Sequence, residues 1–563
     1  MRALLRLTFL LIASFPAAWA AGPALSGQMA VTAHPLASQA AFAMLQRGGS
    51  AVDAAIAAQM VLTLVEPQSS GIGGGAFLLH YRAEGGLMQA FDGRETAPKA
   101  AGPGLFLKPD GSRMKWTDAR QGGRSVGVPG TVRMLALAHG QHGRLPWADL
   151  FQPAIKLAAD GFPVPERMHA AIARVKDWSL LPDAAAYFLD GDGEPWPAGH
   201  LLRNPALAET FRALAADPDA LNTGPIAGRI VAAVRGYEAN PGLLTAADLA
   251  AYQPKVREAV CGPYLAYRVC GMPPPSSGGP TVLMILGFAE RLKLHGHDPA
   301  SPAWAHLFAE ASRVAFADRN QYMADPDFVP QPTAGLIDAA YLDQRVRLID
   351  PAAALGKVEP GQPPEKQGSL LSPHPGVNER GTSHLSIVDA AGNVVSMTTT
   401  IESALGSRLL VGGFLLNNEL TDFSFLPAKD GAPVANRVES GKRPRSSMAP
   451  VIVFDAAGEP VLAAGSPGGS RIIGYTAGAV IRVLGHGQTP QQAVEARHVI
   501  NRNGSSTEIE EGAGAEPLAA ALEALGHKVK VRGLTSGLHL IKITPESLQA
   551  GVDPRREGQA IGE

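Results

Sequence analysis

A Gly-Thr junction that leads directly into a hairpin is the feature that most restricts how this chain can fold. Alternating side chains predict one strand over Thr382–Val388, and the polar stretch Asp389–Asn393 predicts a turn. A second strand is predicted over Val394–Thr400. Symmetrical pairing about this turn places Thr382 opposite Thr400. The sequence therefore predicts two threonine hydroxyls side by side at the open end of a hairpin.

The junction has the chemistry of a bond that is cut to release a nucleophile. A threonine that becomes N-terminal carries its own base, because a free α-amine has a pKa of about 7.7–8.0. Before the cut, the Thr382 hydroxyl can attack the Gly381 carbonyl to give an ester that water opens. Glycine tolerates the strained backbone that this attack requires. Thr400 is predicted to orient the Thr382 hydroxyl, and His384 lies on the same face two residues along.

Composition and element order describe a globular α+β protein. The chain has 563 residues, of which 46% are hydrophobic and 18% charged, with a net charge of -2. This balance gives no support for binding to nucleic acid or to an anionic membrane surface. Helical patterns dominate the middle of the chain and strand patterns both ends, which suits layered sheets covered by helices. The length allows two to four domains or one large layered domain.

The first 20 residues have the three-part layout of a secretory signal. Arg2 and Arg6 precede the apolar run Leu7–Phe15, and Ala18–Ala20 supplies small residues for a signal peptidase. The alternative is an ordinary N-terminal helix. We expect a signal peptide over residues 1–20, no membrane anchor, and a periplasmic or secreted product.

The two cysteines, Cys261 and Cys270, flank a Gly-Pro turn in a predicted short hairpin. An exported protein favours a disulfide between them. Two buried free thiols are the alternative. Neither interpretation gives the pair a chemical role.

Common catalytic and cofactor motifs are absent or lack their structural context. Residues Gly71–Ala76 match a dinucleotide pattern, but a strand rather than a helix is predicted after them. Gly123–Gly127 matches G-x-S-x-G without the preceding strand that a nucleophile elbow needs. The sequence contains neither H-E-x-x-H nor C-x-x-C. We therefore expect no cofactor and no metal.

Several spaced motifs resemble the γ-glutamyltranspeptidase (glutathione hydrolase) family of N-terminal-nucleophile hydrolases. The resemblance covers essentially the whole chain after the signal. It rests on Gly71–Gly75, Phe91–Pro98, Met272–Gly279, Gly381–Asp389, Leu416–Phe423, Arg443–Met448, Gly465–Arg471 and Asp553–Arg555. The resemblance implies a four-layer αββα sandwich that cuts itself between Gly381 and Thr382. It also implies a large subunit over residues 21–381, which ends in an exposed linker, and a small subunit over 382–563. The two form one intertwined heterodimeric domain.

Site roles follow from the resemblance, residue by residue. Thr382 is the expected nucleophile, its new amine the base, and Thr400 its hydrogen-bonding partner. The backbone N–H groups of Gly468 and Gly469 are the expected oxyanion hole. The substrate α-carboxylate is assigned to Arg94, Ser446 and Ser447, and the α-ammonium to Glu419 and Asp422.

Two departures from the family pattern affect the substrate. Glu402 stands where many members carry an amide residue, which predicts three carboxylates around one ammonium. Three such groups do not easily ionise together. The stretch Leu426–Lys442 corresponds to the lid of some members; it is predicted to be a short surface loop without an aromatic side chain. We therefore expect an open site that favours water or bulky substrates.

The leading functional hypothesis is a γ-glutamyl hydrolase/transferase. It would cleave glutathione and related γ-glutamyl amides and pass the acyl group from Thr382 to water or to an amino acid or peptide. Rivals of the same fold are a glutaryl (cephalosporin) acylase and a poly-γ-glutamate depolymerase. A non-catalytic γ-glutamyl-binding protein is the alternative of a different class.

Overall fold

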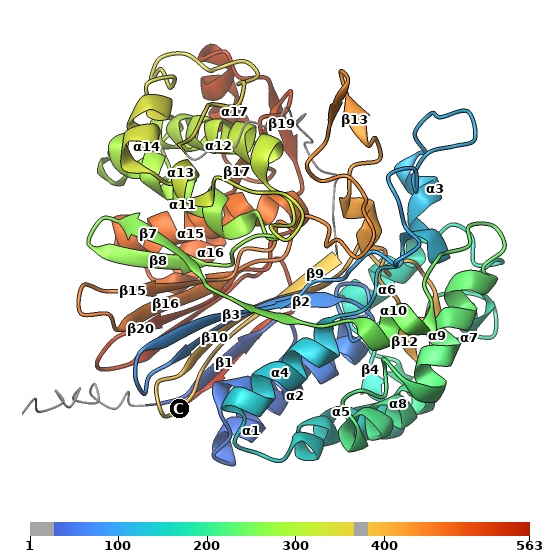
Figure 1. Cartoon of the computed structure of the whole chain (residues 1–563). Helices are drawn as coiled ribbons and strands as arrows, with labels where there is room; N and C mark the ends of the chain where they lie inside the picture. Colours follow the sequence, from blue (N-terminus) through green and yellow to red (C-terminus); the bar gives the residue numbers. More distant parts are fainter. Residues whose placement is uncertain (1–26, 365–380) are drawn as a thin grey trace, which may run out of the picture.

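Two stacked β-sheets form the centre of the molecule, and helices cover the outer face of each (Figure 1). The structure is a computed structural model, and it describes residues 27–364 and 381–563. The predicted signal peptide and residues 365–380 of the predicted linker lie outside the described residues. The layer order is helix, sheet, sheet, helix, as the αββα prediction requires.

The first sheet has seven strands, and the predicted hairpin lies at its centre. Its strand order is β22 (Gln559–Gly562), β1 (Met29–Thr32), β9 (Gly381–Val388), β10 (Val394–Glu402), β2 (Gly75–Arg82), β3 (Leu87–Gly93) and β6 (Lys255–Arg257). Every residue of β9 and β10 is buried. Both faces of the hairpin are therefore enclosed by other layers.

The second sheet has six strands and packs on the first. Its order is β21 (Leu548–Val552), β20 (His539–Ile543), β16 (Pro460–Gly465), β15 (Val451–Phe454), β8 (Tyr267–Gly271) and β7 (Val260–Tyr264). Strand β2 shows how alternation joins the layers. Phe77 and Leu79 pack toward the second sheet, while Ala76 and Leu78 pack toward the helices.

Two groups of helices form the outer layers. The first sheet is covered by α1 (Pro35–Gln46), α2 (Ala51–Val65), α4 (Thr131–His142), α5 (Gln152–Asp160) and α8 (Pro205–Ala216), and the second by α11 (Gly278–Arg291), α12 (Pro302–Tyr322), α15 (Ile472–Gly485) and α16 (Pro490–Glu495). All of α2 is buried, as its alanine-rich sequence predicts, and a Ser50–Asp53 capping box begins it.

Shorter elements complete the chain. The remaining helices are α3 (Trp116–Arg120), α6 (Glu166–Ala173), α7 (Pro182–Phe188), α9 (Gly224–Gly236), α10 (Ala246–Ala251), α13 (Thr333–Leu336), α14 (Ala339–Val346) and α17 (Ala515–Ala524). The small sheets pair β4 (Phe162–Pro163) with β5 (Leu201–Leu202), β11 (Leu410–Val411) with β12 (Phe414–Leu415), β13 (Ala428–Lys429) with β14 (Ala432–Pro433), and β17 (Val499–Ile500) with β18 (Thr507–Glu510) and β19 (Val529–Arg532). No helix among the described residues is long and apolar enough to cross a membrane.

Both large sheets mix strands from before and after the Gly-Thr junction. In the first sheet β9, β10 and β22 follow the junction, and in the second sheet only β7 and β8 precede it. Neither part of the chain can complete a sheet without the other.

Strand pairing confirms the register predicted for the hairpin. Thr382 pairs with Thr400 and Val388 with Val394, and a register shift after Thr400 places Glu402 opposite Gly381. Cys261 pairs with Cys270 across β7 and β8, and their sulfurs are bonded, which decides between the two interpretations of the cysteines.

Two segments differ from the sequence predictions. The stretch Phe414–Phe423 is predicted to be a strand that runs into a polar turn; the strand is only Phe414–Leu415, and Glu419–Asp422 forms a short 3-10 helix. The segment Leu426–Lys442 is only partly a surface loop. It forms the β13–β14 hairpin, and the residues after the hairpin bury the side chains of Val438 and Lys442. The buried lysine ammonium donates hydrogen bonds to Ala435 O and Glu439.

Candidate active site

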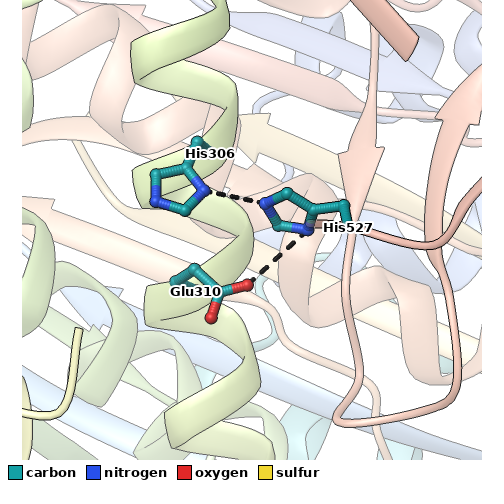
Figure 2. Close-up of side chains that lie close together, drawn as sticks. All are labelled: His306, Glu310 and His527. Carbon is teal, nitrogen blue, oxygen red and sulfur yellow. Dashed lines mark hydrogen bonds and ion pairs between the residues drawn. The ribbon is translucent and has the colours of Figure 1, made fainter. Parts of the chain in front are cut away.

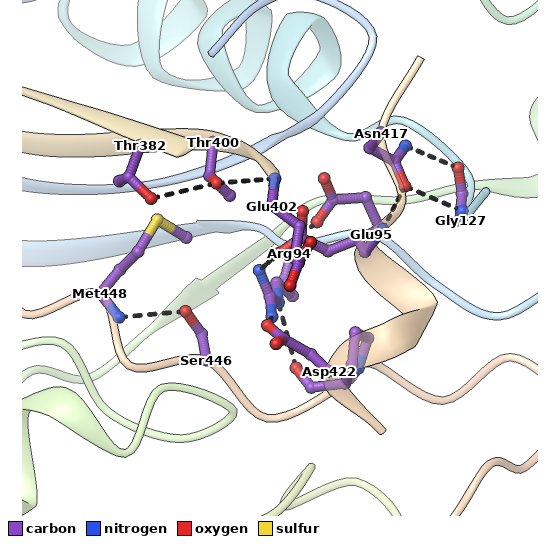
Figure 3. Close-up of polar contacts among 12 residues, drawn as sticks. Arg94, Glu95, Gly127, Thr382, Thr400, Glu402, Asn417, Asp422, Ser446 and Met448 are labelled. Atoms are coloured by element: carbon purple, nitrogen blue, oxygen red, sulfur yellow. Dashed lines mark hydrogen bonds and ion pairs between the residues drawn. The ribbon is translucent and has the colours of Figure 1, made fainter. Parts of the chain in front are cut away.

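The open end of the β9–β10 hairpin brings both threonine hydroxyls to one peptide bond. Thr382 Oγ1 lies 2.7 Å from Gly381 O and 3.2 Å from Thr400 Oγ1. Thr400 Oγ1 lies 2.5 Å from the same carbonyl oxygen and accepts from the Glu402 N–H at 2.9 Å. Figure 3 shows Thr382, Thr400 and the Glu402 amide in one line. The Thr400 hydroxyl can therefore polarise the carbonyl that the Thr382 hydroxyl would attack.

Close backbone contacts restrict position 381 to glycine. A Cβ at Gly381 would lie 2.7 Å from Ser403 O and 2.9 Å from Gln68 O. The two carbonyl groups belong to different backbone segments and contact the junction from two directions. Room for a side chain at position 381 would require one of these backbone segments to shift. The glycine is required for this close approach as well as for its backbone freedom.

The glycine-rich run before β2 forms part of the same site. A Cβ added at Gly73 would lie 2.1 Å from Leu415 O, and one added at Gly74 would lie 2.0 Å from Thr400 O. A Cβ added at Gly75 would lie 2.4 Å from the Glu95 carboxylate. The run is thus packed against the hairpin and is followed by strand β2. It does not form the strand–turn–helix of a dinucleotide site.

The G-x-S-x-G match is likewise structural. Ser125 is buried in a short 3-10 helix and donates to Arg120 O at 2.6 Å. Gly127 N–H donates to Asn417 Oδ1 at 2.9 Å. The serine has the geometry of a turn residue and not of a nucleophile elbow.

A buried cluster of acidic residues surrounds one arginine beside the hairpin. The Arg94 guanidinium donates to Glu419 and Asp422 and also to Pro444 O at 3.1 Å. Arg94 and Glu419 are each 1% exposed. Glu95 Oε2 lies 3.8 Å from Arg94. The structure thus brings together the residues that were assigned to opposite ends of an amino acid, and they bond to each other.

The carboxyl groups of this cluster are difficult to ionise together. Burial, more than the neighbouring charges, raises the pKa of Glu95 to about 8. Burial also raises the pKa of Glu419 well above its usual value, although Arg94 opposes this rise. For Glu402, burial and the charges of Asp422 and Glu419 all raise the pKa. For Glu402 and Glu419, two of the three carboxylates predicted around one ammonium, these directions agree with the expectation that the three do not easily ionise together.

Glu402 lies where the hairpin register shifts. Its φ of 75° is in the left-handed region, an uncommon conformation for a glutamate. Asn418 donates to Glu402 Oε2. Among the described residues, Glu402 Oε1 is buried and has no hydrogen-bond partner. This oxygen is free to accept a hydrogen bond from a bound cation.

Hydrogen bonds hold both serines at fixed positions, Ser446 through the loop before α11 and Ser447 through Arg319 on α12. Ser446 accepts from Ser277 at its carbonyl oxygen, and its hydroxyl accepts from the Met448 N–H at 3.1 Å. Ser447 Oγ lies 2.5 Å from Arg319 Nη2. Figure 3 places Ser446 beside the Arg94 cluster.

The Gly468–Gly469 turn follows the end of β16. Gly468 has φ 132° and Gly469 φ 62°, so both occupy backbone conformations that favour glycine. A Cβ at Gly465 would meet the His384 ring at 2.2 Å, so β16 ends against β9. The turn is therefore close in the fold to the strand that begins at the junction.

His384 itself belongs to the packing between the sheets. Its ring nitrogens lie 2.9 Å from Thr398 Oγ1 and 3.2 Å from Ser386 Oγ. Burial, with a smaller contribution from His539, lowers its pKa well below the usual value. His384 is thus a neutral, fully engaged side chain.

Sequence reasoning assigned no role to several buried polar residues of this region. Asn417 bonds to Gly73 O and to Gly127, and Asn418 joins Ser403 to Glu402. Both asparagines lie inside the motif Leu416–Phe423, so their position in that motif could have identified them as site residues. Glu66 and Arg556 hydrogen-bond to Ser383 and Thr382 on β9. Arg556 directly follows the motif Asp553–Arg555, whereas Glu66 lies five residues before Gly71–Gly75.

A histidine cluster far along the chain satisfies the distance requirements of a metal site (Figure 2). It consists of His306 and Glu310 on α12 and of His527. His306 Nδ1 lies 2.8 Å from His527 Nε2, and His306 Nε2 lies 2.9 Å from Asp350 O. Glu310 Oε1 already accepts from Arg313 at 3.0 Å. The nitrogen and oxygen atoms that would bind a metal ion therefore already make hydrogen bonds within the protein.

Comparisons with known proteins identify the family of this chain. The model of the gamma-glutamyltranspeptidase family matches residues 37–563. A glutathione hydrolase proenzyme of Bacillus subtilis is 36% identical over 546 residues, which are 95% of this chain and 91% of that protein. An acylase ACY 1 proenzyme of Pseudomonas sp. is 36% identical over 535 residues, 93% of this chain and 91% of that protein.

A solved structure matches the whole fold. The crystal structure of cephalosporin acylase from Bacillus halodurans superposes with a TM-score of 0.82 at 26% identity and covers 99% of both chains. The family model spans nearly all of the described residues, and the relatives match on both sides of the Gly-Thr junction. This chain is therefore an enzyme of the gamma-glutamyltranspeptidase family, with the N-terminal-nucleophile hydrolase fold.

Proposed function

We propose that this enzyme cuts itself between Gly381 and Thr382 and then hydrolyses or transfers γ-glutamyl groups through Thr382. The carrying observation is the contact of the Thr382 and Thr400 hydroxyls with one carbonyl, that of Gly381, at 2.7 and 2.5 Å. The proenzyme names of its relatives support the self-cleavage.

Self-cleavage and turnover use the same atoms. The Thr382 hydroxyl attacks the Gly381 carbonyl, and Thr400 donates to the developing oxyanion. The C–N bond between Gly381 and Thr382 then breaks, the hydroxyl proton passes to the departing Thr382 amine, and water hydrolyses the resulting ester. The released amine then takes the hydroxyl proton when Thr382 attacks a γ-glutamyl amide. The N–H groups of Gly468 and Gly469 stabilise the oxyanion of that step. Water or an amino acid or peptide removes the acyl group.

The Arg94 cluster is the proposed recognition site for the amino acid end of glutathione and related substrates. The α-carboxylate displaces carboxyl groups from Arg94 and also binds Ser446 and Ser447. The α-ammonium then binds the carboxyl groups of Glu419, Asp422 and Glu402. A zwitterion can make this exchange with little net change in buried charge, whereas a ligand without an ammonium leaves the acidic groups unpaired.

The large subunit (21–381) and small subunit (382–563) stay together as a heterodimer in this proposal. The mixing of their strands in both sheets supports it.

We place the enzyme in the periplasm or outside the cell, because residues 1–20 resemble a signal peptide. Phe425 stacks on Phe106 with ring centroids 4.3 Å apart, so this aromatic side chain is already engaged. The site is proposed to stay open to water and bulky acceptors.

Substrate choice separates this function from that of a glutaryl acylase. The two acyl groups differ only in the α-amine, which the acidic cluster is proposed to bind. We expect kcat/KM for a γ-glutamyl anilide to exceed that for the glutaryl anilide by about 100-fold or more, since charge-assisted hydrogen bonds contribute roughly 1.5–3 kcal/mol each. The measurement is release of the same aniline from both compounds. Preference for the glutaryl anilide would favour the acylase function instead.

A further inference from the structure

A buried arginine holds the carbonyl of the proposed nucleophile from behind. Arg556 Nη1 donates to Thr382 O at 2.8 Å, and Arg556 Nε donates to Ser536 O at 3.0 Å. The side chain is 1% exposed. Arg556 Nη2 also donates to Thr535 O at 3.5 Å, so three hydrogen bonds to main-chain oxygens fix the guanidinium next to Thr382.

The sheet geometry explains why a side chain is needed there. Strand β1 pairs with β9 only as far as Thr32 opposite Leu385. Within the described pairing, the first residues of β9 therefore have no strand on the side away from β10. Arg556 supplies the donor that a strand would otherwise provide.

A buried carboxylate balances the guanidinium. Glu66 Oε2 lies 3.9 Å from Arg556 Nη1 and accepts from Ser383 Oγ at 2.8 Å. Glu66 Oε1 lies 3.4 Å from Arg167 Nε. Burial alone would raise the pKa of Glu66, but Arg167 and Arg556 outweigh it and the pKa lies below its usual value. Glu66 is therefore ionised at neutral pH.

We propose that Arg556 is a positioning residue that holds Thr382 in place after the cut and keeps its freed α-amine in the neutral, proton-accepting form. The inference rests on the proposed function, since it requires Thr382 to become N-terminal. The amine and the carbonyl belong to one residue, so the guanidinium lies within roughly 6 Å of the amine. A positive charge at that distance disfavours a second one. Glu66 has the opposite influence and limits it.

The other titratable groups of this region leave these two charges dominant. Burial lowers the pKa of Arg556 to about 9, which leaves it charged at neutral pH. Burial also lowers the pKa of His539 to about 4 and that of His384 well below its usual value, and it raises the pKa of Tyr475. Asp553 lies 3.0 Å from Arg555. Around Glu66, Arg167 is a further cation that faces it. Burial lowers the pKa of His34 and raises the pKa of Glu557, the other two titratable groups that act on Glu66 or are acted on by it.

The test is the pH dependence of kcat/KM for a γ-glutamyl anilide with the processed enzyme. Its acid limb reports the pKa of the base in the free enzyme. We expect Arg556→Met to move this limb up by about one to two pH units, since a charge at this distance is worth that much in a partly screened site. Glu66→Gln should move it down by a smaller amount. Arg556→Lys keeps the charge and should leave the limb in place while lowering kcat.

Comparison of the variants with a control separates an effect of Arg556 on the pKa of the amine from a merely structural role. Arg347→Met, at an exposed position after α14, is the control and should match wild type. Opposite shifts for Arg556→Met and Glu66→Gln support the proposal. An unmoved limb with lowered kcat in Arg556→Met overturns it. If Arg556→Met stays uncut, Glu66→Gln decides, and a limb at or above the wild-type position overturns the proposal. An uncut wild type contradicts the proposed function itself.

Discussion

Replacing Thr382 by alanine should leave the chain in one piece and reduce turnover of γ-glutamyl anilides to the detection limit. The methyl group cannot attack the Gly381 carbonyl, and without the cut no α-amine is released to act as the base. Denaturing gels would show one full-length band after prolonged incubation, whereas the wild type would show two. Thr382→Ser keeps a hydroxyl and should slow both cleavage and turnover without abolishing either.

The neighbouring Thr399 offers a matched control. It lies next to Thr400 on β10, and among the described residues its buried hydroxyl has no hydrogen-bond partner. Thr399→Val retains the shape of the side chain and should cleave and turn over like wild type. Full cleavage of Thr382→Ala would mean that another group cuts the chain.

Replacing Arg94 should have the second largest effect, because one guanidinium serves both the fold and the proposed substrate site. Arg94→Met would leave Glu419 and Asp422 buried without their cation, which costs about 3–5 kcal/mol of unfolding free energy. Arg94→Lys keeps the charge but loses the two parallel hydrogen bonds. We expect kcat/KM of Arg94→Lys for a γ-glutamyl anilide to fall roughly 100-fold or more.

A substrate without the α-carboxylate separates recognition from general damage. Wild type should turn over a 4-aminobutyryl anilide weakly, and Arg94→Lys should have nearly the same kcat/KM for it. Thermal unfolding of both variants measures the effect on the fold. An equal loss on both substrates would remove the assignment of the α-carboxylate to Arg94.

The hairpin and most of the layered fold could be predicted because local pattern determines them. Alternation and a polar turn were sufficient to set Thr382 opposite Thr400. The alanine-rich sequence of α2, apolar on more than one side, indicated a buried helix. These features depend on neighbours in sequence, which the pattern contains.

The parts that could not be predicted depend on contacts between distant segments. Arg556 reaches Thr382 across 174 positions of the chain, and Arg94 reaches Asp422 across 328. The sequence indicated an ammonium site and a carboxylate site, but not that Arg94 and the acidic residues pair with each other. The sequence predicted a polar turn after the strand that begins at Phe414, but not that Glu419 and Asp422 would form a short 3-10 helix and bond to Arg94.

N-terminal sequencing of the fragments of the purified protein tests the central claim most directly. The account predicts two fragments that stay associated under native conditions, of which the smaller begins with Thr382-Ser383-His384. A single uncut chain, or a smaller fragment that begins at any other residue, would contradict it.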